Sequence, residues 1–152
     1  MKIKHISTPT KVARPGMSVG EVMLECVEKD VPGIPFVDST GQLTGRFSVR
    51  HLFVVCCIPY DILHGAHLLG DDIEHLDFPH IQAGELMEKQ VDEFIFPDAI
   101  RLSPNFQAIK ALAIMEQYNT QYLFVSEGEE YQGVVTRMSI AKAIVTKECC
   151  KN

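Results

Sequence analysis

The sequence predicts an α+β fold of two pseudo-symmetric β-α-β-β-α units, packed sheet to sheet, with a partly helical insertion between them. Two observations carry this prediction. The segment IPFVDSTGQLTGRFS (34–48) recurs as YLFVSEGEEYQGVVT (122–136), and an amphipathic helical pattern precedes each copy. An internal repeat of this kind indicates a duplicated structural unit. Four aligned pairs share an offset of 88 residues: Phe36 with Phe124, Val37 with Val125, Gly45 with Gly133 and Ser48 with Thr136.

The first unit is expected to place a helix before a β-hairpin. Ser18 and Glu21 have the spacing of a capping box, in which two side chains satisfy free backbone N–H groups at a helix start. Apolar strands are expected at 34–37 and 43–47, on either side of a polar turn. A second helix is expected after Ser48. The first helix presents an apolar face at helical spacing: Val19, Val22, Met23, Cys26 and Val27.

The second unit repeats this order. The sequence Ser103-Pro104-Asn105 is expected to open its first helix, because proline is tolerated in a first turn. The hairpin strands are expected at 122–125 and 133–135, and a helix follows Thr136. Neither unit alone can cover both faces of so small a sheet, so the two units are expected to share one core. The expected apolar face of the first helix is Phe106, Ile109, Leu112 and Ala113.

The repeat divides the chain into a first unit (1–53), an insertion (54–82) and a second unit (83–152). The insertion is long for a connection and shows local helical spacing, which predicts one or two helices. The segment 83–90 is expected to form a helix at the start of the second unit. The apolar positions of the insertion are Ile62, Leu63, Leu68 and Leu69.

Composition excludes several classes of protein. The 152 residues carry a net charge of −6 and no basic patch, which argues against nucleic acid as a partner. The longest apolar run, at 52–58, is too short to span a membrane, and the N-terminus has no signal-peptide pattern. The five cysteines form no Cys-x-x-Cys motif, so reduced thiols in a cytoplasmic protein are expected.

The motifs of the two units resemble a known family. The first unit reads Pro35-Phe-Val-Asp38, Gly41, Gly45 and Ser48, and the second keeps Gly133-Val-Val-Thr136-Arg137. This tandem pattern resembles a pair of CBS domains, also called a Bateman module, over nearly the whole chain except 54–82. The resemblance implies a regulatory module that binds AMP, ADP, ATP or S-adenosylmethionine between its units. It also implies a homodimer, and the signal would pass through that dimer or to an unknown effector protein.

The resemblance also implies two clefts, each built from both units. The first cleft would use Thr10, Lys11, Gly33, Ile34 and Pro35 opposite Thr136, Arg137 and Ser139. The second, weaker cleft would use Pro97, Asp98, Gln121, Tyr122 and Leu123 opposite Ser48 and His51. His51 and Ser139 stand where the family has a ribose-binding Asp. The first cleft ranks higher because a carboxylate at Asp98 would repel a phosphate.

Each site residue has a simpler alternative. Ser48 and Thr136 are favoured residue types for helix N-caps, so they need no ligand to explain them. His51 is explained as a partly buried polar residue between the units. The loss of both family carboxylates favours a second function class, a structural or scaffolding dimer with degenerate clefts.

The remaining polar clusters predict neither catalysis nor a bound metal. No catalytic or phosphate-loop motif occurs, so a non-enzyme is expected. The adjacent cysteines Cys56-Cys57 and Cys149-Cys150 are better explained as ordinary thiols than as redox sensors. A solvated acidic loop is likewise favoured over a metal site for the polar residues of the insertion: His64, His67, His75 and His80 among Asp61, Asp71, Asp72, Glu74 and Asp77.

Overall fold

The computed structural model describes residues 1–58, 64, 65, 67 and 80–149, and it has the expected mixed architecture. Most of the insertion, including Ile62, Leu63, Leu68 and Leu69, lies outside the described residues. The helices are α1 (Val19–Lys29), α2 (Val49–Leu52), α4 (His80–Glu88), α5 (Ala108–Gln117) and α6 (Arg137–Cys149). The strands are β1 (Gly33–Val37), β2 (Leu43–Ser48), β3 (Arg101–Leu102), β4 (Tyr122–Glu127) and β5 (Glu130–Thr136).

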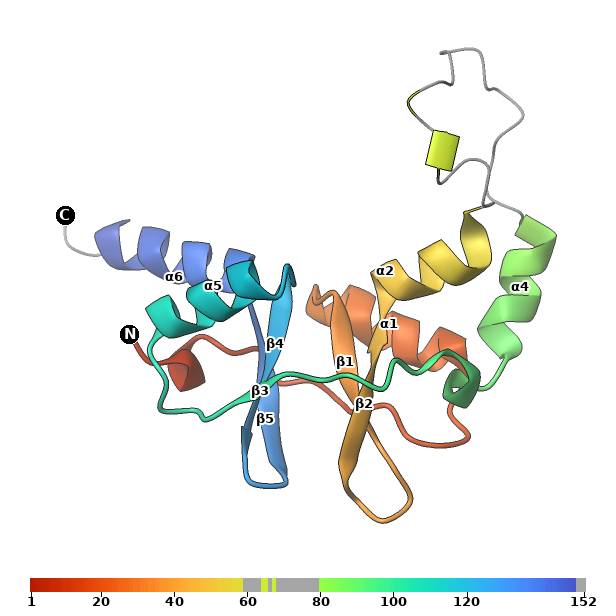
Figure 1. Ribbon diagram of the computed structural model, residues 1–152, viewed down its shortest axis with the longest axis horizontal. Coiled ribbons are helices and arrows are strands. Elements are labelled where there is room, and N and C mark those ends of the chain that lie inside the picture. Colours follow the sequence, from red (N-terminus) through yellow and green to blue (C-terminus); the bar gives the residue numbers. More distant parts are fainter. Residues whose placement is uncertain (59–63, 66, 68–79, 150–152) are drawn as a thin grey trace.

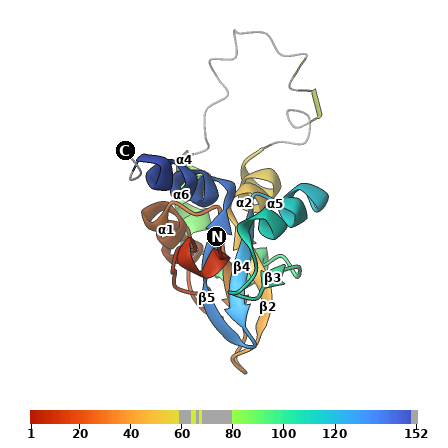
Figure 2. The ribbon, with the colours of Figure 1, turned by 90° about the vertical axis from the view of Figure 1, so that its left-hand side faces the viewer.

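The two units lie side by side, each with its own small sheet (Figure 1). In the first unit β1 pairs with β2 in antiparallel orientation, and in the second β4 pairs antiparallel with β5 and parallel with β3. Both hairpins point the same way, and α1, α2, α5 and α6 gather at the opposite end of the strands (Figures 1 and 2). The helix α4, expected at the start of the second unit, packs against α1, and its Leu86 belongs to the core beneath α1.

Each unit is completed by a segment that leads into the other one. Thr8 exchanges two backbone hydrogen bonds with Val134 on β5, at 2.8 and 2.9 Å. Phe96 makes the same pair of bonds to Arg46 on β2, both at 2.9 Å. We call the chain around Thr8 and around Phe96 the two crossing segments. Because of them, Ile3 lies in the core of the second unit.

The hairpin register corrects the sequence alignment by one residue. Ile34 pairs with Phe47, and in the second unit Leu123 pairs with Val135, so Ile34 corresponds to Leu123 and not to Tyr122. The ungapped alignment of the first strand is therefore wrong. The reason is physical, since successive strand residues point to opposite faces and only Leu123 faces the core of its own unit. Tyr122 is thus the counterpart of Gly33.

The first helix of the second unit also departs from the sequence prediction. It begins at Ala108 and not at Ser103, because Ser103 accepts a turn hydrogen bond from Phe106 and Met1 accepts one from Ala108. The predicted apolar face is only partly right, since Phe106 and Leu112 pack against the core but Ile109 is 74% exposed. The buried residues of α5 are two small ones and one large one: Ala108, Ala111 and Met115.

A close fit between the two sheets joins the counterparts Gly33 and Tyr122. A Cβ atom on Gly33 would lie 2.4 Å from the Phe47 carbonyl oxygen and 2.6 Å from the Tyr122 hydroxyl oxygen. Real Cβ atoms do not approach so closely, and the packed interior leaves little room to relax. Glycine at this position therefore lets the buried tyrosine ring enter the boundary between the units.

We predict that Gly33→Ala destabilises the fold by about 1–3 kcal/mol, as overpacking does. Thermal unfolding should show a clearly lower melting temperature. Gly84→Ala in α4 is the matched control, because a Cβ there meets no atom within 4 Å and alanine favours a helix. Equal melting temperatures for the two variants would contradict this account of the interface.

Candidate functional site

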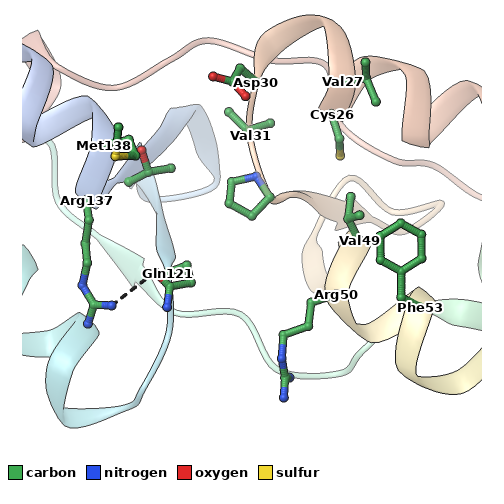
Figure 3. Close-up of a pocket in the computed structure, with 12 residues that line it drawn as sticks. Cys26, Val27, Asp30, Val31, Val49, Arg50, Phe53, Gln121, Arg137 and Met138 are labelled. Carbon is green, nitrogen blue, oxygen red and sulfur yellow. Dashed lines mark hydrogen bonds between the residues drawn. The ribbon is translucent and has the colours of Figure 1, made fainter. Parts of the chain in front are cut away.

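The main cavity described lies between the two units and has a volume of about 670 Å³ (Figure 3). Volumes of 300–1,000 Å³ are usual for small-molecule sites. Its walls come from the end of α1 and the following loop, the start of α2, the loop before β4 and the start of α6. Among the predicted site residues, Gln121, Thr136 and Arg137 line it.

Charged groups lie at two ends of this cavity. Figure 3 shows Asp30 at one end and the side chains of Arg50 and Arg137 directed toward the other. Apolar side chains, among them Val31 and Val49, lie between these ends. The sequence analysis did not identify Arg50 or Asp30 as site residues, since both belong to turns and helix ends where charged residues are common.

The two hydroxyl residues at the helix starts do cap their helices. The Ser48 hydroxyl accepts a hydrogen bond from the backbone N–H of His51 at 3.3 Å, and Thr136 accepts one from Ser139 at 2.9 Å. The Ser139 hydroxyl in turn accepts from the Thr136 N–H and donates to the Thr136 carbonyl. The capping alternative is confirmed for both residues.

The structure does not gather the predicted first cleft into one cavity. Lys11 and Ile34 line a separate cavity of about 240 Å³ beside α1, where the buried Glu25 accepts a hydrogen bond from the Lys11 N–H. The Thr10 hydroxyl lies 2.6 Å from that of Tyr131. Gly33 and Pro35 are buried within β1. Arg137 faces the main cavity but already donates to Glu116 and Gln121, at 2.9 and 3.2 Å.

The residues of the predicted second cleft are also spread over several places. Pro97 and Asp98 are exposed on their crossing segment, while Leu123 is buried in the core of the second unit. Ser48 and Tyr122 are buried at the boundary between the units. The ring of His51 meets that of Phe96 edge to face, with centroids 4.8 Å apart.

Arg46 lies at this second boundary and was missed by the sequence analysis. Its guanidinium carbon is 5.1 Å from the centre of the Phe96 ring and 5.5 Å from that of Tyr122. Burial, and then the charges of Arg46 and Arg50, lower the pKa of His51. One signal was available, because Arg46 is a charged residue inside an otherwise apolar strand whose counterpart is Val134.

The other candidate groups lie only partly within the described part of the chain. No set of three or more His, Cys, Asp or Glu side chains there is close enough to hold a metal ion, and His75 with its acidic neighbours lies outside it. Cys26, Cys56 and Cys57 are free thiols, whereas Cys150 lies outside that part. None of the helices described combines the length and apolar character that crossing a bilayer requires.

The match to a family model decides the classification. The model described as CBS domain matches residues 3–56 and again residues 83–146. The chain belongs to the CBS-domain family. Because the model matches two segments of one chain, the tandem pair expected from the repeat is confirmed.

Solved structures share this fold at low sequence identity. CBSX2 from Arabidopsis thaliana is 19% identical, with a TM-score of 0.65 over 97% of this chain and 96% of that one. CBSX2 in complex with AMP is 20% identical, with a TM-score of 0.61 over 97% and 98%. A CBS domain-containing protein from Bacillus anthracis is 18% identical, with a TM-score of 0.63 over 97% and 94%. Curated protein sequences give no significant match.

We predict that Cys26, which lines the main cavity, resists alkylation in the native state. Burial, and then the adjacent charge of Glu25, raise the pKa of Cys26 to about 12. A raised thiol pKa means a protonated group below it, so at pH 8 only about one thiol in ten thousand is the reactive thiolate. Peptide mapping after iodoacetamide should find the half-buried Cys57 labelled first and Cys26 labelled only in denaturant. Equal labelling rates in the native protein would refute this.

Proposed function

We propose that the chain is a regulatory binding module that takes an adenosine-type nucleotide or a related ligand, such as S-adenosylmethionine, in the main cavity between its two units. The observation that carries the proposal is the lining of that cavity. It has an apolar middle, an acidic end at Asp30 and a basic end at Arg50 and Arg137. The apolar middle suits an adenine ring and the guanidinium groups suit a phosphate, the two outer parts of an adenosine nucleotide.

The family carboxylates are absent at His51 and Ser139, so in this proposal recognition rests on the two ends of the cavity. The guanidinium groups face the phosphate, and Asp30, at the opposite end, accepts hydrogen bonds from donor groups of the base. Arginine suits phosphate because its planar fork donates two parallel hydrogen bonds. The AMP complex of CBSX2, a protein with the same fold, supports an adenosine-type ligand for this family.

Binding at a boundary between two units gives a means of regulation. A ligand shifts the balance between two arrangements of the units only by the difference in its affinity for them. The cavity walls come from both units, so any change in their relative angle alters the site. The signal would then pass to a second copy or to an effector protein.

One set of observations favours the second candidate, a scaffolding dimer. Many of the predicted polar ligand groups are already bound within the chain: Thr10 by Tyr131, Arg137 by Glu116, and Thr136 and Ser139 by each other. A ligand would have to compete with these contacts. This reading becomes the better one if no nucleotide stabilises the protein.

We predict that AMP, ADP, ATP or S-adenosylmethionine raises the melting temperature of the purified protein. At a concentration of a hundred times Kd, a ligand that binds the native state adds about 2.7 kcal/mol to the free energy of unfolding. This produces a readily measured rise in melting temperature. Arg137→Ala should remove most of this rise in melting temperature while keeping the helix cap. The double variant, Thr136→Ala with Arg137→Ala, should reduce the rise still more. Arg101→Ala is the control, because its exposed side chain pairs with Glu129 on the β4–β5 hairpin. An unchanged shift in the double variant would mean that the ligand binds elsewhere.

We also predict a homodimer that covers the mouth of the cavity. Val27 and Met138 line this cavity and are 69% and 76% exposed, an unfavourable state for a pair of large apolar side chains beside one site. Changing both to serine should lower the weight-average mass measured by analytical ultracentrifugation toward that of one chain. A wild-type protein that is monomeric at every concentration would instead assign this surface to another protein.

A further inference from the structure

We propose that the smaller cavity, between α1 and the chain around Lys11, binds a compact organic cation of the aliphatic diamine class. This site is separate from the main cavity, because the two cavities share no lining residue. It does not depend on the proposed function. It also reverses the charge of the ligand, since the sequence predicted a nucleotide at Lys11 and Ile34.

Glu25 supplies a buried carboxylate that faces this cavity. The residue lies on α1, lines the cavity of about 240 Å³ and is only 6% exposed. Its Oε2 accepts one hydrogen bond, from the Lys11 N–H at 3.2 Å, and its Oε1 accepts none from the described residues. Oε1 is not sealed within the core, so it opens onto the cavity. A carboxylate has about four acceptor sites, and most of those of Glu25 are therefore left for a ligand.

The charge of Glu25 has no cation beside it. Glu25 takes part in none of the ion pairs found among the described residues. Burial raises the pKa of both Cys26 and Tyr131 to about 12, and the charge of Glu25 adds to each rise. A buried charge without a counter-ion is unfavourable. A cation bound in the cavity would remove this cost.

Two more carboxylates extend the acidic wall of the cavity. Glu21 and Glu28 lie four residues before and three residues after Glu25, a spacing that places all three on one face of the helix. No three acidic side chains of the described residues are close enough together to hold a metal ion. Side chains one turn apart are separated by about 5–6 Å at Cβ, which suits two ammonium groups on a short aliphatic chain.

The remaining walls suit the apolar part of such a ligand. Met17, Leu24 and Ile34 line the cavity, and Leu24 is 55% exposed although it is large and apolar. The methylene groups of a diamine would cover these side chains. Typical sites for drug-sized ligands have volumes of about 300–1,000 Å³. At about 240 Å³ this cavity suits a ligand smaller than a nucleotide.

The second unit supplies an internal comparison. Asp30 and Asn119, both with positive φ, mark the same place at the ends of α1 and α5, and the paired hairpins share their offset of 89 residues. With that offset Ile114 is the counterpart of Glu25, and it packs against the core of the second unit. The same fold therefore forms with an apolar side chain at this place. The carboxylate of Glu25 needs a cause other than the fold.

The test measures binding of 1,4-diaminobutane to the full chain by calorimetry, with 1,4-butanediol as the neutral control ligand. Glu25→Gln keeps the shape of the side chain and removes its charge. We expect it to weaken diamine binding about ten- to a hundredfold, the usual effect of losing a hydrogen bond to a charged group. Glu127→Gln, at an exposed glutamate of β4, removes the same charge elsewhere and should leave the affinity unchanged.

Two further variants examine the charge and the fold separately. Lys11→Met removes the basic side chain of this cavity and should strengthen diamine binding several-fold, because a like charge no longer opposes the ligand. Glu25→Ile copies the residue of the second unit. It should abolish diamine binding and raise the melting temperature, because the buried charge is replaced by an apolar group.

The outcomes that overturn the proposal are specific to this cavity. The site is refuted if the wild type binds no diamine at millimolar concentration, or binds the diol equally well. It is also refuted if Glu25→Gln, shown to be folded by circular dichroism, binds the diamine within twofold of wild type, since the cation then binds elsewhere. Weaker AMP binding by Lys11→Met would assign the cavity to a phosphate group and refute the cation site.

Discussion

The fit of Tyr122 against Gly33 sets how the two units meet. These residues are counterparts in the repeat: one carries a large aromatic ring and the other has no side chain. The absence of a Cβ on Gly33 lets the aromatic ring reach the backbone of the opposite sheet. The main cavity lies next to this contact, because Pro32 and Gln121, the residues that precede Gly33 and Tyr122, both line it. The packing of Arg46 depends on the same ring, because its guanidinium group lies near the rings of both Phe96 and Tyr122.

Local patterns explain which parts of the fold could be predicted from the sequence. Hairpins, helix caps and the repeat depend on residues within a few positions of one another, so Ser18, Ser48 and Thr136 were identified correctly as caps or cap candidates. Features that depend on register were not predictable in this way. The one-residue shift between the hairpins is invisible in an ungapped alignment, yet it exchanges Gln121 for Tyr122 as the counterpart of Gly33.

The candidate sites show the same difference between features set by local pattern and features set by tertiary structure. Thr136 and Arg137 were predicted in the first cleft and Gln121 in the second, yet all three line one cavity. Lys11 and Ile34 were named on the same basis but line another, because motif position fixes a residue along its strand and not the face to which it points. Arg50, Asp30 and Arg46 have no motif of their own. Their roles arise from tertiary contacts between segments far apart in the chain, such as the bond between Phe96 and Arg46.

The crossing segments have a consequence for how the protein is made. The bonds of Arg46 reach Phe96, so the first sheet is complete only after the chain beyond the first unit has been synthesised. The bonds of Thr8 reach Val134, so this early segment has no partner until the second hairpin has been made. Contacts at such large sequence separation slow folding, because the intervening chain must be closed before they form. During translation the first hairpin therefore has an unpaired edge strand. Such an edge is the part of a β-sheet most prone to pair with other chains and aggregate. The two units therefore complete their folding together, and the N-terminal residues reach their final positions only after the second hairpin has formed.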